Sequence, residues 1–221
     1  LSGNPLCVFE DGSGIDEPTM QALALQFNLS ETTFILPADA ANARVRIFTP
    51  SYEMPFAGHP TLGTAHVVRD LFARNNHLTL EMPAGIIPVS AQGDHWELCA
   101  KPALTREPQA SRAALAVALG LDEPDIAGPP LWVNSGSEQL IVPLASADAV
   151  RRVRVSIAAL REATADGARA QVYVFARHAD GSVLARFFFS KDDSVIEDPA
   201  TGSATANLGG WLLANAAPLP L

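Results

Sequence analysis

Two glycine-containing turns are the places in the sequence where chemistry could most readily occur. They are Gly58-His59 and Thr201-Gly202-Ser203, and each leads into an apolar segment expected to be a helix. The first N–H groups of a helix lack intrahelical partners and carry partial positive charge, so they can bind a carboxylate or stabilise a developing oxyanion. Facing each other across a cleft, the two turns would hold an anionic substrate from both sides. The alternative interpretation is ordinary helix capping by Thr201 and Ser203.

Three further side chains could handle protons. Glu31 stands between Leu29 and Phe34, where partial burial would raise the pKa of its carboxyl toward the range of general acid–base catalysts. Asp198 precedes a helix start, where it could hydrogen-bond a substrate or orient a histidine. His59 also lies at a helix start, where the helix dipole favours the neutral ring. The alternatives are a solvent-facing loop glutamate for Glu31 and an N-terminal cap for Asp198.

Common cofactor and nucleophile motifs are missing from the sequence. His59 and His66 are two helical turns apart and too distant to share one metal ion, and no zinc spacing is visible. There is no Gly-x-Ser-x-Gly elbow, P-loop or Gly-x-Gly-x-x-Gly pattern. We therefore expect neither a metal nor a cofactor.

Composition excludes several classes of partner. The 221 residues carry a formal net charge of -9, which argues against nucleic acid and anionic membranes because both require clustered Lys and Arg. No apolar run reaches the ~20 residues of a membrane span. Cys7 and Cys99 lie in apolar, strand-like runs, so we expect buried free thiols and a reducing, cytoplasmic compartment.

Hydrophobic periodicity and turn residues predict alternating helices and short strands. A proline- and charge-containing stretch at 101–109 is the expected boundary between two parts of the chain. The helices are expected over 16–28, 60–72, 111–119 and 156–165. The strands are expected over 33–36, 43–48, 78–81, 86–90, 96–100, 131–133, 139–143, 171–176 and 183–189.

One pattern occurs twice along the chain. Arg46-Ile47-Phe48 is followed by a loop, Glu53 and the glycine turn at 57–61, and Arg186-Phe187-Phe188 is followed by a loop, Glu197 and the turn at 200–204. Both turns open segments that are apolar nearly all round, so both helices should be buried. The repetition indicates a duplicated fold.

Together these segments resemble the PhzF family, named for an isomerase of phenazine biosynthesis. The resemblance rests on residues 3–5, 28–34, 46–50, 53–63 and 197–204. It spans essentially the whole chain. Compared with a typical member, the beginning of the first strand and roughly the last 50 residues are expected to be missing, together with the closing strands of the second half.

The resemblance implies an α+β, diaminopimelate epimerase-like fold. Its two pseudo-symmetric halves, expected at 1–103 and 104–221, would each curl a mixed sheet or barrel around a central helix, with the site between them. Related racemases use a cysteine at each central-helix N-terminus. Here the matching positions are Ala57-Gly58 and Thr201-Gly202, so a two-thiol mechanism is not expected.

The resemblance implies a reaction driven by one carboxylate. Glu31 would move a proton on a small, carboxylate-bearing substrate, in the narrowest form a cyclic, dihydro-hydroxyanthranilate-like one. His59 and Asp198 would assist, and the substrate-binding residues would be Asn4, Gly58, Thr201, Gly202 and Ser203. A homodimer is the family-level expectation. The alternatives are an amino-acid epimerase or racemase of the same fold, a hydrolase using Ser203, and a non-catalytic small-molecule-binding protein.

Overall fold

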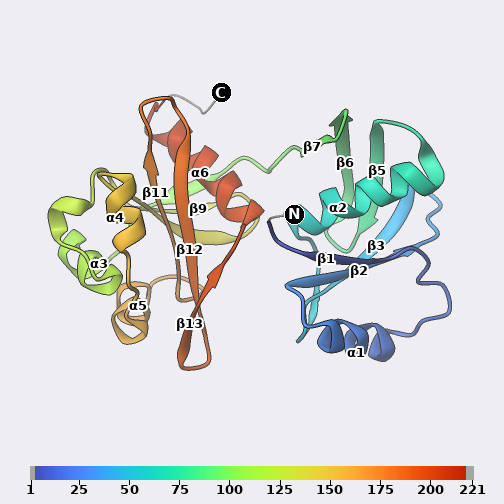
Figure 1. The fold of residues 1–221 in the computed structure, drawn as a ribbon, viewed down its shortest axis with the longest axis horizontal. Coiled ribbons are helices and arrows are strands. Elements are labelled where there is room, and N and C mark those ends of the chain that lie inside the picture. The colour runs from blue at the N-terminus through green and yellow to red at the C-terminus, as the bar shows by residue number, and fades with distance from the viewer. Residues whose placement is uncertain (1–2, 218–221) are drawn as a thin grey trace. The chain divides into compact units, whose positions relative to one another are not determined.

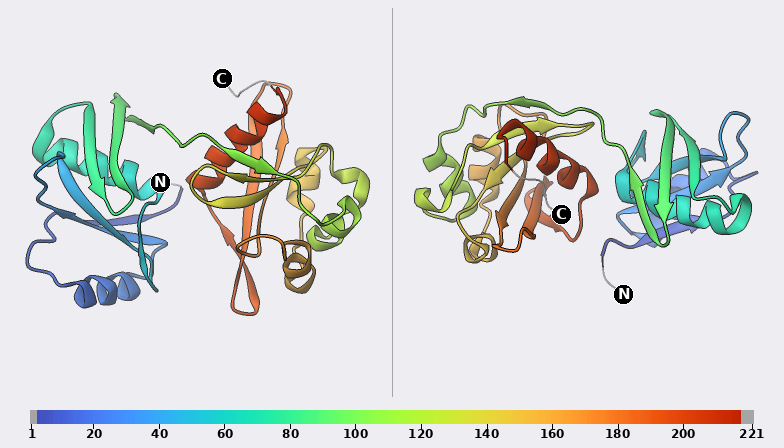
Figure 2. Two further views of the ribbon diagram at one scale, coloured as in Figure 1. Left: turned by 180° about the vertical axis from the view of Figure 1, so that it is seen from behind. Right: turned by 90° about the horizontal axis from the view of Figure 1, so that it is seen from above.

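The structure is a computed structural model that describes residues 3–217. Its chain divides into two compact units, residues 1–99 (unit 1) and residues 100–221 (unit 2) (Figure 1). The chain passes from one unit to the other through the extended segment after β7 (Figure 2). The sequence Leu1-Ser2-Gly3-Asn4-Pro5 predicts a strand and turn, but Leu1 and Ser2 lie outside the described residues.

Unit 1 contains a mixed sheet with the strand order β1-β2-β3-β5-β6-β7, in which β4 also pairs with β3. Strands β1 and β2 are parallel and β2 and β3 are antiparallel. Its elements are β1 (Leu6–Phe9), α1 (Glu17–Phe27), β2 (Glu31–Leu36), β3 (Ala43–Phe48), β4 (Glu53–Met54), α2 (Gly58–Val68), the π-helical turn η1 (Arg69–Ala73), β5 (His77–Met82), β6 (Gly85–Gln92) and β7 (His95–Leu98).

Helices α1 and α2 cover opposite faces of this sheet (Figure 1). Successive side chains of a strand point to opposite faces. Phe34 and Phe48 therefore pack with Met20 of α1, while Ile35 and Ile47 belong to the core around α2. Asp16 caps α1 by accepting a hydrogen bond from Thr19 N–H, as its sequence signature predicts.

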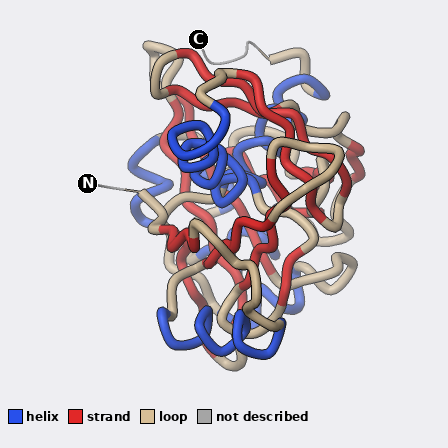
Figure 3. Tube along the Cα trace, turned by 90° about the vertical axis from the view of Figure 1, so that its right-hand side faces the viewer, coloured by secondary structure: helices blue, strands red, loops and turns tan. Residues whose placement is uncertain are grey.

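Unit 2 contains a six-stranded sheet with the order β13-β12-β11-β10-β9-β8. Figure 3 distinguishes strands from helices along the whole trace. Its elements are β8 (Leu104–Arg106), α3 (Arg112–Leu119), the 3-10 turn η2 (Glu123–Asp125), β9 (Leu131–Asn134), β10 (Glu138–Pro143), α4 (Ala147–Arg152), α5 (Ile157–Ala163), β11 (Gln171–Arg177), β12 (Val183–Lys191), β13 (Ser194–Asp198) and α6 (Gly202–Ala214).

The two faces of the second sheet are also covered by different helices. Val172 and Val174 of β11 pack in the core formed with α3, α4 and α5. Tyr173 and Phe175 of the same strand pack with α6. The alternation along β11 thus matches the alternation along β2, with α6 in the role of α2.

The strand pairings show that the units repeat one topology. In unit 1, β1 is parallel to β2, β2 is antiparallel to β3, β3 is antiparallel to β4, and α2 follows. In unit 2, β10, β11, β12 and β13 pair in the same order and directions, and α6 follows. The registers agree as well, because Phe48 pairs with Glu53 and Phe188 pairs with Glu197. The duplication indicated by the sequence is therefore present in the topology.

Most expected elements are present, but several bounds were wrong. The helix expected to begin at Pro60 begins at Gly58, and it ends at Val68 before a π-helical turn. The stretches at 53–54 and 194–198, expected to be loops, are strands β4 and β13. Helix α6 is less buried than expected, since Leu213 is exposed.

The exposure of the two cysteines differs from the expectation, and the helices can be compared with the length of a membrane span. The expectation of two buried thiols was wrong for Cys99, which is exposed just after the last strand of unit 1, and was met only in part by Cys7, which is half-buried. Within residues 3–217 no helix is both long and apolar enough to cross a bilayer.

Candidate active site

Glu31 is the first residue of β2, where its Cα pairs with that of Leu6 on β1. It belongs to a strand rather than to the loop of the alternative interpretation. Strand alternation puts Glu31 on the same face as Thr33 and Ile35, which is the face covered by α2. Its side chain is 15% exposed, so the carboxylate is largely shielded from water but reachable.

His59 is the second residue of α2 and lies beside Glu31. Its Nε2 atom is 3.4 Å from Oε2 of Glu31, and its side chain is 26% exposed. The two residues are far apart in the sequence, yet the structure brings them together within unit 1. An imidazole and a carboxylate at this distance need to approach only slightly to come within the reach of a proton-transferring hydrogen bond, a tightening that is common when a substrate binds.

Two contacts fix α2 against the strands that carry this pair. The hydroxyls of Thr33 on β2 and Thr64 on α2 are hydrogen-bonded at 2.8 Å, and both residues are fully buried. One position earlier on the helix, a Cβ at Gly63 would lie 2.7 Å from Cδ2 of Leu6. The absence of a side chain at Gly63 therefore lets the helix approach β1 closely.

The N-terminus of α2 also belongs to the candidate site. Gly58 is the first helical residue, and Ala57, at the N-cap, has no side chain that could cap the helix. Asn4 lies two residues before Leu6, on the run of chain that leads into β1. These positions agree with the predicted substrate-binding role of Gly58 and Asn4 without testing it.

In unit 2 the predicted residues gather at the N-terminus of α6. Asp198 is the last residue of β13, and the hydroxyl of Thr201 donates a hydrogen bond to Asp198 Oδ2. Within the described residues Thr201 therefore does not cap α6 with its side chain, although it is the N-cap residue. Gly202 and Ser203 begin the helix, and their N–H groups belong to its first turn.

Sequence reasoning missed two amides that contact Ser203 directly or through one partner. Gln139 on β10 donates from Nε2 to Ser203 Oγ at 3.0 Å. Asn207 on α6 donates from Nδ2 to Gln139 Oε1 at 2.8 Å. A signal for Asn207 existed, because it is a polar residue one helical turn after Ser203 in a mostly apolar segment.

Comparison with known proteins identifies the family. The family model described as phenazine biosynthesis-like protein, PhzC-PhzF, matches residues 1–217. The chain belongs to the PhzC-PhzF family.

Individual members agree with this assignment. A trans-2,3-dihydro-3-hydroxyanthranilate isomerase of Pseudomonas aeruginosa is 36% identical over 214 residues, which cover 94% of this chain and 73% of the relative. The crystal structure of a PhzF-family phenazine biosynthesis protein of Bacillus anthracis has a TM-score of 0.87 at 27% identity, covering 95% of this chain and 74% of that one. The expectation of an isomerase is thereby confirmed.

The fold class is confirmed too. A probable proline racemase of Agrobacterium radiobacter, only 13% identical, has a TM-score of 0.58 over 99% of this chain and 74% of its own. The α+β architecture with two curled sheets around central helices is thus shared by PhzC-PhzF proteins and racemases.

The shared registers of the two units give each site residue of this PhzC-PhzF chain a counterpart in the other half. Phe34 on β2 pairs with Arg46, and Val174 on β11 pairs with Arg186, so Phe34 corresponds to Val174. Three positions earlier on the same strands, Glu31 therefore corresponds to Gln171. Counting on from Glu53 and Glu197, Gly58 corresponds to Gly202, His59 to Ser203 and Gly63 to Asn207. The two helix openings therefore share a backbone plan but differ in chemistry.

Among residues 3–217 no three His, Cys, Asp or Glu side chains are grouped so that they could hold a metal ion.

Proposed function

We propose that this PhzC-PhzF protein is a proton-transferring isomerase in which Glu31 is the general base and then the general acid. The observation that carries the proposal is the Glu31–His59 pair, with Oε2 and Nε2 3.4 Å apart and both side chains mostly buried. A carboxylate shielded from water keeps the proton that it has taken, because exchange with solvent is slow there.

The proposed step needs one acid–base residue and no oxidant or reductant. The Glu31 carboxylate removes a proton from a saturated carbon of the substrate, and the C–H electron pair moves into an adjacent π system. The protonated Glu31 then delivers the same proton to another carbon on that face, which leaves the substrate isomerised and the carboxylate restored. His59 hydrogen-bonds the carboxylate or the substrate during the transfer.

Unit 2 supports a single base rather than two. Its counterpart of Glu31 is Gln171, and an amide cannot accept a proton at ordinary pH. The helix openings where related racemases carry thiols have Ala57-Gly58 and Thr201-Gly202 instead. We therefore favour isomerisation over two-base racemisation.

The residues of unit 2 are proposed to serve the same reaction by binding. Ser203 and the N–H groups at the start of α6 would hold the substrate carboxylate, since a helix N-terminus favours an anion. Asp198, fixed by the Thr201 hydroxyl, would hydrogen-bond a polar group of the substrate. Kinetics of variants in each unit test whether both serve one substrate.

The substrate class is a small carboxylate, and a cyclic dihydro-hydroxyanthranilate is the first compound to try because the Pseudomonas aeruginosa relative is named for it. Cofactor independence and a homodimer complete the proposal. Both are checked in one preparation, by activity after dialysis against a chelator and by light scattering of the eluted protein.

The decisive experiment follows the turnover of a panel of cyclic and amino-acid carboxylates by NMR in heavy water. The proposed step should isomerise its substrate with little deuterium incorporation, because Glu31 returns the proton that it removed. We expect Glu31→Gln to lower kcat by about 100-fold or more, since a positioned acid–base group contributes roughly 10²–10⁴. The matched control is Glu10→Gln, which alters an exposed carboxylate of the same unit and should leave turnover unchanged.

The outcomes separate the rival functions. Full activity in Glu31→Gln would refute the proposed base. Exchange at the α-carbon of an amino acid would favour an epimerase. Binding of a carboxylate without exchange or turnover would favour a non-catalytic binding protein.

A further inference from the structure

A pair of buried amides lies between β10 and α6 in unit 2. Asn207 has no exposed surface and Gln139 is 3% exposed. Buried amides are costly unless their donors and acceptors are satisfied. Here they are linked to each other and to Ser203, so their hydrogen bonds can be followed atom by atom.

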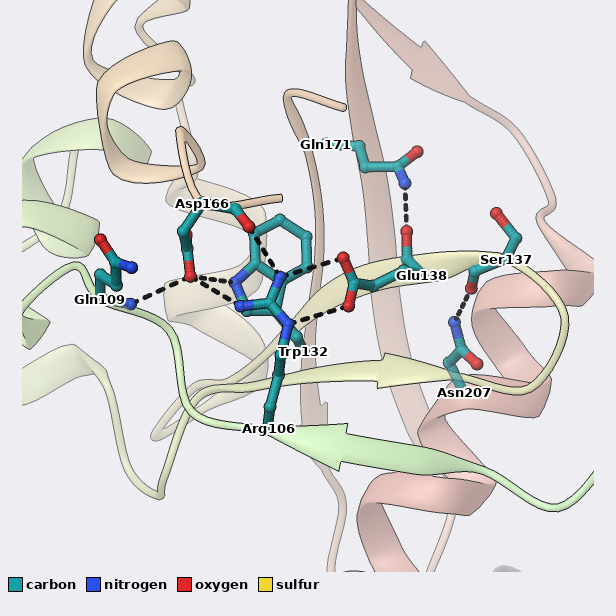
Figure 4. A network of polar contacts seen from close by, with 8 residues as sticks. All are labelled: Arg106, Gln109, Trp132, Ser137, Glu138, Asp166, Gln171 and Asn207. Carbon is teal, nitrogen blue, oxygen red and sulfur yellow. Dashed lines mark hydrogen bonds and ion pairs between the residues drawn. The ribbon is translucent and has the colours of Figure 1, made fainter. Parts of the chain in front are cut away.

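The orientation of Asn207 is fixed by backbone groups on both sides. Its Oδ1 accepts from the backbone N–H of Ser135 at 2.9 Å and from the Ser135 hydroxyl at 2.7 Å. Its Nδ2 donates to the carbonyl oxygen of Ser137 at 2.8 Å (Figure 4). A backbone N–H can only donate and a carbonyl can only accept, so the amide cannot be reversed.

The orientation of Gln139 follows from that of Asn207. The second Nδ2 hydrogen of Asn207 is donated to Gln139 Oε1 at 2.8 Å. Gln139 must therefore present its Nε2 to Ser203, and the Nε2–Oγ distance is 3.0 Å. The Ser203 oxygen accepts this hydrogen bond, which leaves the hydroxyl proton to be donated elsewhere.

We infer that Gln139 and Asn207 are positioning residues that make the Ser203 hydroxyl a hydrogen-bond donor to a carboxylate oxygen of the substrate. This inference rests on the proposed function, in which Ser203 binds the substrate carboxylate. It deepens that proposal by naming the residues that set the direction of the hydrogen bond.

The turn that anchors Asn207 is itself held at several points (Figure 4). The Glu138 carboxylate accepts two hydrogen bonds from Arg106, each 3.0 Å long, and its carbonyl accepts one from Gln171. Arg106 also bonds Asp166 at 2.8 Å, and Asp166 accepts from Trp132 Nε1 at 3.1 Å. The backbone groups that orient Asn207 are therefore in a fixed place.

Unit 1 lacks the same device. The counterpart of Asn207 is Gly63, and the counterpart of Gln139, by the pairing of β1 with β2, is Leu6. The Leu6 side chain lies where a Cβ of residue 63 would be placed, so this position is filled by apolar atoms. The fold can thus seat its central helix without amides, so the amide chain serves the Ser203 position rather than helix packing in general.

The test is a double-mutant cycle between Gln139→Met and Ser203→Ala, with two readouts. Gln139→Met removes the Nε2 donor while keeping the length of the side chain, and should raise KM about three- to tenfold with kcat little changed, the effect of one hydrogen bond. In the Ser203→Ala background the same change should add little, because Gln139 acts through Ser203.

The matched control is Gln109→Met, an exposed glutamine of the same unit, which should leave KM unchanged. Urea unfolding of each variant identifies any loss of folded protein. The second readout, the Kd for 3-hydroxyanthranilate by calorimetry, needs no turnover and should show the same coupling.

Each result decides one of the two proposals. Equal effects of Gln139→Met with and without the Ser203 hydroxyl would overturn the inference, as would a loss in kcat alone. Failure of the wild type to bind the carboxylate probe would also overturn it. If the double-mutant cycle shows coupling in Kd but the wild type has no isomerase activity, only the isomerase mechanism is refuted.

Discussion

At the scale of single residues, the hydrogen bond between Thr33 and Thr64 connects the strand of Glu31 with the helix of His59. Both hydroxyls lie in the protein interior, 2.8 Å apart. Removing one member of a buried pair leaves the other without its partner, which costs more than removing both. The pair therefore couples stability with the geometry of the candidate site.

Thr64→Val should lower the free energy of unfolding by about 1–3 kcal/mol, because it strands the Thr33 hydroxyl. The double variant Thr33→Val with Thr64→Val should recover most of this loss. Urea unfolding measures both. A double variant that is as unstable as the sum of the single ones would contradict this interpretation.

The residue types and their sequence context indicated Glu31, His59, Asp198 and Ser203 as candidate site residues. They could not predict which of these side chains lie in contact. The Glu31–His59 contact depends on the pairing of β2 with its neighbours and on the close approach at Gly63. Gln139 was missed because a single glutamine in a strand carries no pattern until its partner on α6 is known.

At the scale of elements, each unit has the same brace, which consists of an arginine, a phenylalanine and a glutamate. Arg186 Nε and Nη2 bond the Glu197 carboxylate at 2.7 Å, and its guanidinium lies 4.6 Å from the Phe188 ring centre. Arg46, Glu53 and Phe48 repeat this arrangement in unit 1. The brace fixes the strand that leads directly into each glycine turn.

Each brace also reaches the outer helix of its unit. Arg186 Nη1 donates to the carbonyl oxygens of Val150 and Val153, at 3.0 and 3.2 Å, near the end of α4. In unit 1, Arg46 Nη2 bonds Glu17 of α1 at 2.8 Å. One guanidinium thereby joins three elements in each unit.

Arg186→Met should lower the free energy of unfolding by about 1–3 kcal/mol, since it removes charge-assisted bonds and leaves backbone carbonyls without a donor. The control is Arg161→Met, which removes an ion pair with Asp193 that is 47% and 98% exposed and should cost less than about 1 kcal/mol. Urea midpoints of the two variants provide the comparison. Equal losses would mean that the brace contributes no more than a surface pair.

Sequence periodicity predicted the long elements and missed the short ones. Helix α1 and strand β3 have clear caps or alternation and were predicted correctly. Strand β4 has two residues, and β8 is an exposed three-residue strand near prolines. Such segments are strands because a neighbour pairs with them, which local propensity does not encode.

At the scale of the whole molecule, the described carboxylates whose pKa is lowered by contacts with distant segments lie in unit 2. Burial disfavours the charged form of Asp166, but hydrogen bonds from Arg106, Gln109 and Trp132 outweigh it and lower its pKa. Hydrogen bonds from Arg186 lower the pKa of Glu197. The lowered pKa values of Asp11 and Asp16 in unit 1 come from hydrogen bonds donated by residues two or three positions away.

Acid should therefore unfold unit 2 before unit 1. A carboxyl whose pKa is lowered by folding contributes stability above its unfolded value, about 4, and this is lost as the pH falls through the folded pKa. Pulsed hydrogen exchange at one labelling pH, after incubation between pH 3 and 7, reports each unit by its own peptides.

The variant Asp166→Asn should flatten the pH dependence of unit 2 below about pH 4. Asp39→Asn, a change at an exposed position of unit 1, should not. Earlier loss of protection in residues 3–99 than in unit 2 would contradict the assignment of acid sensitivity.

The repeated brace has a consequence for how such a protein can diverge after gene duplication. The arginine brace lies on the two strands that precede each central helix. Residues 54–59 and 198–203 form the turn after those strands and the first residues of the helix. Mutations in these two hexapeptides leave the brace intact, so each ancestral copy could acquire its own reactivity without losing its scaffold. For protein engineering, the two hexapeptides are natural cassettes for exchange.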